Sequence, residues 1–196
     1  MTRMLLVRHG QSEWNAQGRW QGRADPPLSE LGRRQARHAA ARLGRVDAIV
    51  ASPLRRAFDT ARIMAEQLGV GPVIPDADLV ERDAGEWSGL TRAEIEARWP
   101  GWIEAGRRPE GYEHDDSVIE RVTRALERIE RRHRGADVVI VCHGGIIYAL
   151  EGYHGDPAGR IPNLGARWVT HHGGHLELGD RLLLASEDEL TVPSVL

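Results

Sequence analysis

Two short apolar runs in this sequence each end in a His-Gly pair, at His9 and at His143. Such runs are typical of buried strands, and a glycine directly after a strand lets backbone N–H groups and a following helix N-terminus face an anion. Arg8, directly before His9, adds a planar guanidinium that can bind two phosphate oxygens at once. We therefore expect the two histidines to lie at strand ends and to form one anion site, with a phosphoryl group as its natural ligand.

Apolar strand-like runs alternate with helix-like segments along the chain. Strands are expected at Met4–Val7, at Val46–Ala51, near Leu79 and at Val138–Cys142. Helices are expected at Ser29–Leu43, after a Ser52 cap and Pro53, at Thr91–Trp99, at Asp115–Arg134 and at Gly144–Tyr153. In the tail, Arg167–His171 and His175–Leu178, joined by Gly173 and Gly174, indicate a hairpin. This order predicts an α/β protein with three layers, α/β/α, around a mostly parallel central sheet, with ligands outside the strand carboxyl ends.

Length and composition limit the classes of protein to consider. The 196 residues, of which 41% are hydrophobic, suit a single domain over residues 1–196. A net charge of −3 argues against nonspecific nucleic-acid binding, and no run reaches the ~18 apolar residues that span a membrane. A single cysteine, Cys142, and the lack of an apolar signal region indicate the cytoplasm. Oligomeric state stays open and includes a homodimer, because the apolar helix faces and the tail hairpin suit either core or dimer contacts.

Four further segments fit the same anion site. They are SPLRRAFDTA around Arg56, VERDAGEWSGLT around Glu81, CHGG around His143, and the early loop with Asn15, Gln21 and Gly22. In order and approximate spacing, residues 4 to 165 resemble the histidine phosphatase superfamily, also called the phosphoglycerate-mutase-like family. Within it, the pattern is similar to the phosphatase branch that contains glucosyl-3-phosphoglycerate phosphatases.

The resemblance implies a role for each matching residue. His9 would be the nucleophile that becomes a phosphohistidine, Glu81 the general acid, and the phosphoryl group would be surrounded by Arg8, Arg56 and His143. The family pattern places its arginine directly before an alanine, which selects Arg56 over Arg55. Contacts to the phosphate or its substituent would come from Gly10, Asn15, Gln21, Gly22 and Gly144. The implied substrate is a small phosphomonoester of the sugar-phosphate or phosphoglycerate type, with no metal and no cofactor.

Elementary chemistry agrees with these roles. A neutral imidazole, whose ordinary pKa is about 6.5, can attack phosphorus when its other nitrogen donates to a backbone carbonyl and fixes the tautomer. Charge on the phosphoryl oxygens would be met by Arg8, Arg56 and a protonated His143 in place of a divalent ion. Glu81 would donate a proton to the leaving oxygen and then deprotonate the attacking water.

Other catalytic chemistries find less support in the sequence. A cysteine phosphatase needs an arginine six positions after its cysteine, and that position holds Tyr148, so Cys142 is expected in the core. A serine hydrolase lacks its G-x-S-x-G elbow. The three tail histidines are interpreted as turn residues and not as a metal cluster, because they fall around a Gly-Gly turn. They are His171, His172 and His175.

The substrate side of the site departs from the family pattern. Many relatives carry Gly-Gly-Glu-Ser before the long helix, whereas this chain keeps Glu113 and the later Arg121 but has other flanking residues. Tyr112 and His114 are therefore candidates for contacts to the alcohol part, and Trp20 is a candidate for the cleft wall. The short segment between Glu81 and His143 favours a phosphatase over a phosphoglycerate mutase. A scaffold that binds phosphorylated ligands without turnover is the other alternative.

Overall fold

The structure, a computed structural model, describes residues 2–172 and 175–191. Within these residues, six strands form one sheet in the order β3-β2-β4-β1-β5-β6. They are β1 (Arg3–Arg8), β2 (Ala48–Ala51), β3 (Ile74–Pro75), β4 (Asp137–Cys142), β5 (Gly165–His172) and β6 (His175–Leu183). The first four are parallel, and β5 and β6 add an antiparallel edge. The predicted mostly parallel sheet is confirmed; the expected turn at Gly173 and Gly174 lies outside the described residues.

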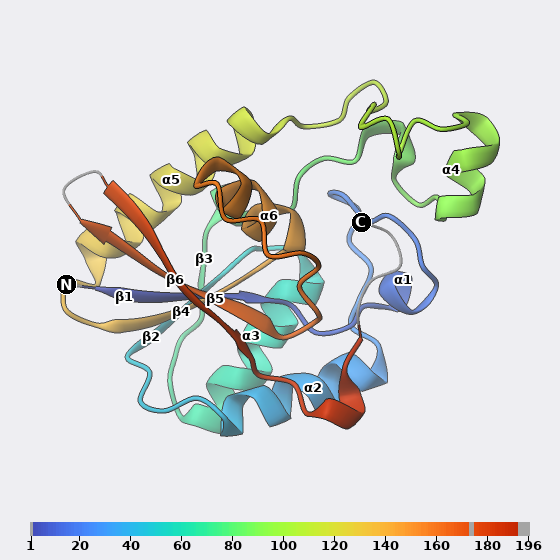
Figure 1. Cartoon of the computed structure of the whole chain (residues 1–196). Helices are drawn as coiled ribbons and strands as arrows, with labels where there is room; N and C mark the ends of the chain where they lie inside the picture. The colour runs from blue at the N-terminus through green and yellow to red at the C-terminus, as the bar shows by residue number, and fades with distance from the viewer. Residues whose placement is uncertain (1, 173–174, 192–196) are drawn as a thin grey trace.

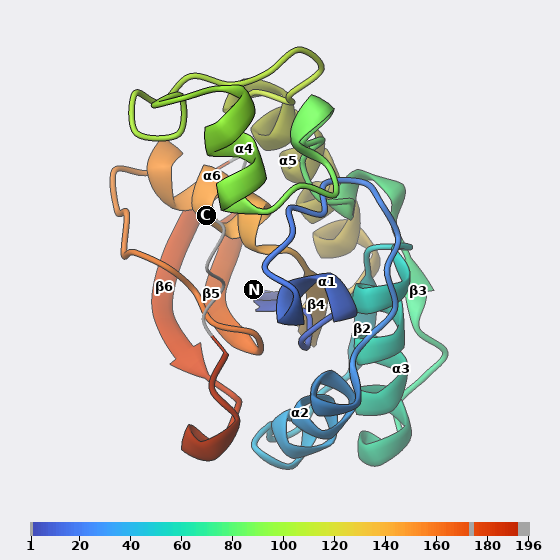
Figure 2. The same ribbon diagram turned by 90° about the vertical axis from the view of Figure 1, so that its right-hand side faces the viewer.

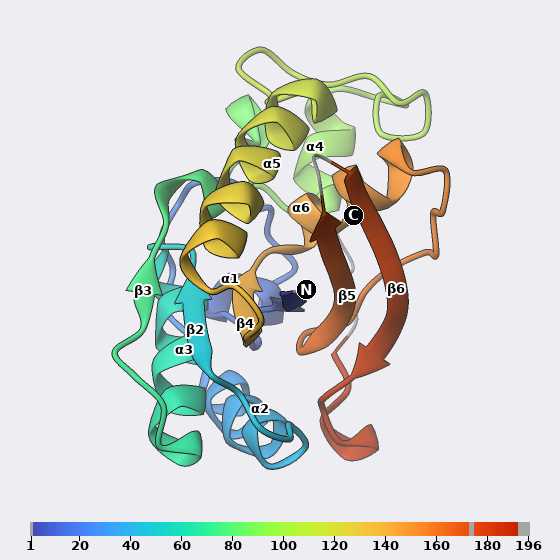
Figure 3. The same cartoon turned by 90° about the vertical axis from the view of Figure 1, so that its left-hand side faces the viewer.

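Helices cover both faces of this sheet (Figures 1 and 3). They are α2 (Glu30–Ala41) and α3 (Arg55–Leu68) on one face, and α5 (Asp115–Arg132) and α6 (Gly144–Tyr153) on the other. Successive strand residues point to opposite faces, so Leu5 and Val7 of β1 pack with α2 and α3, whereas Met4 and Leu6 pack with α5 and α6. The three-layer α/β/α arrangement is therefore confirmed.

Capping residues explain where two of the helices begin. Ser29 caps α2 as predicted, and Thr91 caps α4 (Arg92–Arg98) in a capping box. The expected Ser52 cap of α3 is wrong, because the N-cap is Leu54 and makes no side-chain hydrogen bond. The Ser52 hydroxyl accepts the Leu54 N–H and lies 2.8 Å from Nε2 of His143.

The expected strand near Leu79 is also wrong. The strand in this region is β3, which ends at Pro75, and Leu79 lies in a short 3₁₀ helix, η1 (Ala77–Leu79). Proline has no N–H to extend a strand ladder, and Asp76 then accepts the N–H of Asp78 to start the turn. Leu79 still reaches the core, where it packs with the α5 side.

The region around α4 forms an arm beyond the carboxyl ends of the parallel strands, on the side of α5 and α6 (Figures 1 and 2). It has its own apolar cluster around Trp20, Trp87 and Ile95. Three short elements without a clear sequence signal complete the fold: α1 (Glu13–Ala16), η2 (Gly85–Trp87) and η3 (Glu187–Glu189). Among the described residues, no helix has the length and apolar character needed to cross a membrane.

Candidate active site

The two histidines singled out by the sequence meet at the carboxyl ends of β1 and β4. These strands are parallel neighbours, Arg8 is in register with Cys142, and the His9 N–H donates to the Cys142 carbonyl at 3.1 Å. The following side chains therefore come together, and the ring centroids of His9 and His143 are 5.2 Å apart. Both imidazoles are buried. The structure thus places the two predicted strand-end histidines in one site.

His9 is held as a neutral imidazole with one nitrogen facing away from the backbone. Its Nδ1 lies 2.7 Å from the Gly10 carbonyl oxygen, which can only accept, so Nδ1 carries the proton and donates. Burial, together with the charges of Arg56 and Arg8, holds the pKa of His9 well below its ordinary value. Nε2 therefore keeps its lone pair, as a nucleophile requires.

Arg8 and Arg56 supply buried positive charge beside the imidazoles. Arg8 donates from one terminal nitrogen to the Ile161 carbonyl at 2.6 Å. Arg56 donates to the carbonyls of Ala24 and Gly22 at 2.7 and 2.8 Å. Burial lowers the pKa of Arg56 to about 10, which leaves it charged at neutral pH. The Nε groups of both arginines have no hydrogen-bond partner among the described residues.

Of the two adjacent arginines, Arg56 is buried on the first turn of α3, whereas Arg55 is exposed. The Arg55 backbone N–H donates to Asp25 at 2.6 Å. Of the two arginines, therefore, only Arg56 is buried with the two histidines. This agrees with the selection of Arg56 over Arg55 from the sequence.

The surroundings of His143 favour its neutral form, whereas the sequence predicts a protonated ring beside a phosphoryl group. Burial and the positive charges of Arg56, Arg121 and Arg8 hold the pKa of His143 well below its ordinary value, which favours the neutral ring. Its Nε2 lies 2.8 Å from the Ser52 hydroxyl. Because that hydroxyl already accepts a backbone N–H, its own proton is available for Nε2, which favours the ring proton on Nδ1. Nδ1 has no partner in the described part of the chain, so the neutral ring keeps one donor that is not used within the protein.

Glu81 lies against the N-terminus of α6. One carboxylate oxygen accepts the Gly145 N–H at 3.1 Å, and the other accepts the Arg82 N–H at 2.7 Å. A Cβ on residue 145 would be 2.3 Å from the carboxylate, so a side chain there would displace Glu81 from this position. Gly145 is therefore the glycine of the pair that contacts Glu81. Gly144, which is predicted to contact the phosphate, packs beside the Arg8 side chain, and Gly145 takes its place among the pocket walls.

Three of the predicted catalytic residues, Arg8, His9 and Glu81, line a pocket of about 40 Å³, whereas Arg56 and His143 lie behind its walls. The other lining residues are Asn15, Arg19, Trp20, Gln21, Gly22, Arg82, Ala84, Tyr112 and Gly145. Predicted contact residues Asn15, Gln21 and Gly22 are thus among its walls, and so are Trp20 and Tyr112. Asn15 and Gln21 each accept from residue 12 through the amide oxygen, which leaves their NH₂ groups as donors for a ligand.

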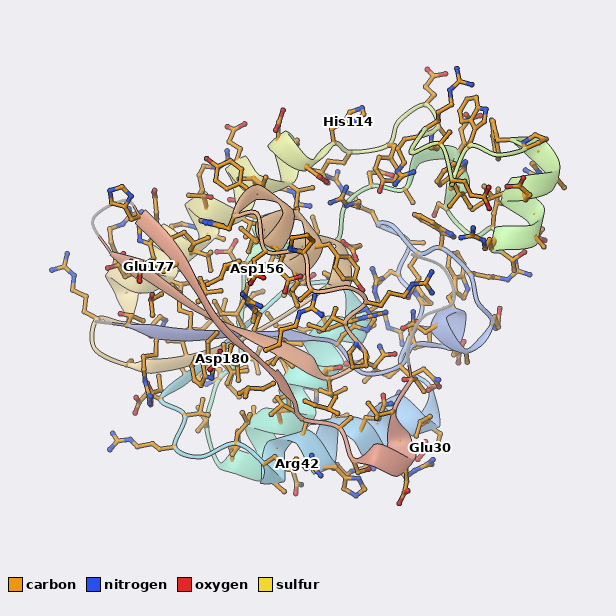
Figure 4. All side chains as sticks on the ribbon, in the orientation of Figure 1. Glu30, Arg42, His114, Asp156, Glu177 and Asp180 are labelled. Carbon is orange, nitrogen blue, oxygen red and sulfur yellow. The ribbon has the colours of Figure 1, made fainter. Side chains whose placement is uncertain are left out.

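Two expected contact residues have other positions. The Gly10 N–H donates to the Thr60 hydroxyl, and a Cβ on residue 10 would lie 2.6 Å from the Gly32 carbonyl oxygen. Gly10 therefore orients His9 and packs against α2 in this conformation, with its amide already bound. His114 is exposed at the start of α5, at the outer edge of the molecule (Figure 4), and does not line the pocket.

A buried ion pair that sequence reasoning did not connect to the site holds the Glu81 segment in place. Glu113 and Arg121 form a two-point pair at 2.9 Å, and Arg121 also donates to the carbonyls of Asp78 and Val80 at 2.6 Å. Burial alone would raise the pKa of Glu113, but the hydrogen bonds and charge of Arg121 lower it to about 2. The pair therefore fixes the backbone directly before Glu81.

Glu113→Gln is expected to lower the free energy of unfolding by about 3 kcal/mol, because it leaves the Arg121 charge buried without its carboxylate. Urea unfolding measures this loss. Glu120→Gln is the matched control, since Glu120 pairs with Arg124 with 76% of its side chain exposed and should change stability by less than about 0.5 kcal/mol. Equal stability of the two variants would contradict the role of the Glu113–Arg121 pair in holding the segment before Glu81.

Stability should fall as the pH drops below about 6.5, the ordinary pKa of histidine. Both His9 and His143 have lowered pKa values in the folded chain, so below that pH the unfolded state binds more protons. Each contributes a slope of up to about 1.4 kcal/mol per pH unit until its folded pKa is reached. Urea unfolding between pH 7.5 and 5 measures the slope, and His143→Gln should remove about half of the histidine share. A flat profile for the wild type would contradict the buried neutral state.

Cys142 and the tail histidines lie outside this chemistry. Cys142 is buried in the core as predicted, and burial raises the pKa of its thiol. His171 belongs to β5, as the strand predicted at Arg167–His171 requires, and not to the turn itself; it is buried, and its Nδ1 lies 2.6 Å from Glu130. Across residues 2–172 and 175–191, no group of three histidine, cysteine or acidic side chains is arranged to hold a metal ion.

Comparison with known proteins adds to this geometry. Residues 4–172 match the family described as histidine phosphatase superfamily (branch 1). Glucosyl-3-phosphoglycerate phosphatase of Mycobacterium tuberculosis is 43% identical over 164 residues, 76% of this chain and 73% of that protein. The structure of mycobacterial glucosyl-3-phosphoglycerate phosphatase complexed with VO3 superposes with a TM-score of 0.83, at 35% identity, over 94% of this chain and 99% of the other.

A bifunctional protein of Mycobacterium tuberculosis is 45% identical over 150 residues. The match covers 72% of this chain but 41% of that protein. This chain therefore corresponds to about two fifths of the length of that relative.

Proposed function

Since this chain belongs to the histidine phosphatase superfamily, we propose that it is a phosphatase that hydrolyses small phosphomonoesters through a phosphohistidine on His9. Membership confirms the resemblance noted in the sequence. Three buried side-chain nitrogens without a hydrogen-bond partner among the described residues carry the proposal: Nε of Arg8, Nε of Arg56 and Nδ1 of His143, whose ring lies 5.2 Å from that of the neutral His9. Buried donors without partners are costly, and a phosphoryl group offers oxygens that satisfy all of them.

The first step transfers the phosphoryl group to the protein. His9 Nε2 attacks phosphorus, a P–N bond forms, and the P–O bond to the alcohol breaks with its electron pair leaving on oxygen. Arg8 and Arg56 stabilise the charge on the phosphoryl oxygens, so this charge is met by side chains and not by a divalent ion. Glu81, in protonated form, gives its proton to the leaving oxygen.

The second step regenerates the protein. Water attacks phosphorus while the Glu81 carboxylate takes a proton from it, the P–N bond breaks, and its electron pair returns to Nε2. The Glu81 segment is anchored by Arg121 and the carboxylate by the Gly145 N–H, which fixes the acid at the mouth of the pocket. Asn15, Gln21 and Gly22 line that mouth and would bind the phosphate or its substituent.

The relative named glucosyl-3-phosphoglycerate phosphatase supports a substrate of the sugar-phosphate or phosphoglycerate type. The test is phosphate release from p-nitrophenyl phosphate and from a panel of phosphorylated metabolites in excess EDTA. The panel includes 3-phosphoglycerate with and without 2,3-bisphosphoglycerate. Hydrolysis in EDTA is the expected result. Isomerisation without phosphate release, or binding of phosphorylated ligands with no turnover on any substrate, would overturn the proposal.

A further inference from the structure

A wider groove of about 580 Å³ adjoins the small pocket. The two share Trp20, Arg82, Tyr112 and Gly145, so a ligand held at His9 continues directly into the groove. Cavities of roughly 300–1,000 Å³ are usual for small organic ligands. The phosphoryl group belongs in the small pocket, and the groove is the space left for the alcohol part of the substrate.

Most charges that line this groove are already paired. Arg82 lies 2.6 Å from Asp115, and Arg92 lies 4.0 Å from Glu104. Arg108 differs, since its guanidinium has no carboxylate within 4.0 Å in the part of the chain that the structure describes. It is therefore a cation of the groove whose charge is not balanced by a neighbouring acid.

Contacts to aromatic rings and to backbone hold Arg108 in position. Its Cζ lies 5.3 Å from the ring centroid of Tyr112 and 5.6 Å from that of Trp87. One terminal nitrogen donates to the Arg107 carbonyl at 3.0 Å. Such contacts restrict the side chain while the remaining N–H groups of its planar fork stay available for an acceptor.

Glu151 is the most buried of the acidic residues that line the groove. It is paired with another arginine and therefore does not neutralise Arg108. Its two carboxylate oxygens accept from Arg181 at 2.7 and 2.5 Å. Tyr112, in contrast, connects the two spaces, because its ring also lies 5.6 Å from the Arg82 guanidinium at the mouth of the small pocket. Arg108 therefore faces the groove directly beside the path from His9.

We propose that the groove binds the leaving alcohol and that Arg108 binds a carboxylate on that alcohol. One unmatched positive charge suits one carboxylate, and the guanidinium fork matches its two oxygens. This inference rests on the proposed function, because it assigns the substrate class of the same site. It makes Arg108 a specificity-determining residue for phosphorylated hydroxy acids.

Matched substrate pairs test the proposal. 3-Phosphoglycerate and glycerol 3-phosphate differ by a carboxylate in place of a hydroxymethyl group, and O-phosphoserine and phosphoethanolamine differ by one carboxylate. In each pair, the carboxylate member should have a kcat/KM at least about tenfold higher, since a charge-assisted hydrogen bond discriminates by that order. Equal values within both pairs would overturn the inference and leave the proposed function standing.

Arg108→Gln should reduce this preference at least about tenfold, mainly through KM. Arg107→Gln is the matched control, because Arg107 is exposed, stacks on Trp102 and does not line the groove. It should keep the wild-type preference. A loss of preference in both variants, or in neither, would contradict the assignment of Arg108.

Calorimetric binding of the same pairs separates this inference from the proposed function. If no phosphomonoester is hydrolysed, the proposed function fails, and the Arg108 inference is then decided by affinity alone. Tighter binding of 3-phosphoglycerate than of glycerol 3-phosphate, lost in Arg108→Gln and kept in Arg107→Gln, supports the inference. Equal affinities overturn it.

Discussion

His9→Ala is expected to abolish turnover while phosphate and vanadate still bind. The substitution removes the only atom proposed to bond to phosphorus, whereas Arg8, Arg56 and His143 keep their donors in place. Loss of a catalytic nucleophile elsewhere lowers kcat by about 10⁶, and a loss of that order is expected. Single-turnover assays with p-nitrophenyl phosphate measure the loss, and calorimetry with vanadate measures retained binding.

The matched control for this substitution is His38→Ala. His38 is an exposed residue of α2 that pairs with Glu189 and does not line the pocket. It should retain wild-type turnover. Turnover by His9→Ala within tenfold of the wild type would show that another group attacks phosphorus.

Glu81→Gln is expected to lower kcat/KM by about 10²–10⁴ for alkyl phosphates, the range that proton donation contributes. The amide keeps the shape of the side chain and an oxygen for the Gly145 N–H, but its N–H groups are too weakly acidic to protonate the leaving oxygen. The loss of kcat/KM should be much smaller for p-nitrophenyl phosphate, because nitrophenolate leaves without a proton. The measurement is kcat/KM for both substrate types, which reports the first step alone, whereas kcat also contains the second step, in which Glu81 acts as the base.

Glu86→Gln is the control for Glu81→Gln, since Glu86 is an exposed acid five residues later in the same segment and does not line the pocket. It should keep wild-type kcat/KM for both substrates. An equal loss of kcat/KM for alkyl and nitrophenyl phosphates in Glu81→Gln would assign Glu81 to positioning and would contradict its role as an acid.

Local signals were sufficient to predict much of the fold. The apolar runs before His9 and His143 predicted β1 and β4, and the helical segments expected from Ser29 and from Thr91 predicted where α2 and α4 begin. Because parallel strands that end together bring their following residues together, the meeting of the two histidines was also predictable. These features depend on short-range patterns and on the geometry of adjacent strands.

Features set by contacts between distant segments could not be read in the same way. Ser52 looked like a helix cap, but its partner is His143, 91 residues away in sequence. Leu79 looked like a strand residue because it is apolar, yet the hydrogen-bond ladder of β3 ends before it, at Pro75. The neutral state of His143 depends on how deeply the fold buries it beside two arginines, and no local pattern reports that burial.

The role of the Glu113–Arg121 pair could not be predicted from the sequence either. Both residues were visible in the sequence, but their connection to Glu81 runs through the carbonyls of Asp78 and Val80. Backbone acceptors carry no sequence signal, since every residue has one. An ion pair that holds a distant segment through backbone carbonyls can therefore be recognised only when the three-dimensional path of the chain is known.

The most direct test of the central claim is to identify the phosphorylated atom during turnover. The wild type is mixed with substrate in EDTA, quenched in alkali, in which phosphohistidine survives, and mapped by mass spectrometry. The account predicts a phosphoryl group on His9, formed before phosphate release and missing in His9→Ala. Phosphorylation of a different residue, or activity that disappears in EDTA and returns only with a divalent metal ion, would contradict it.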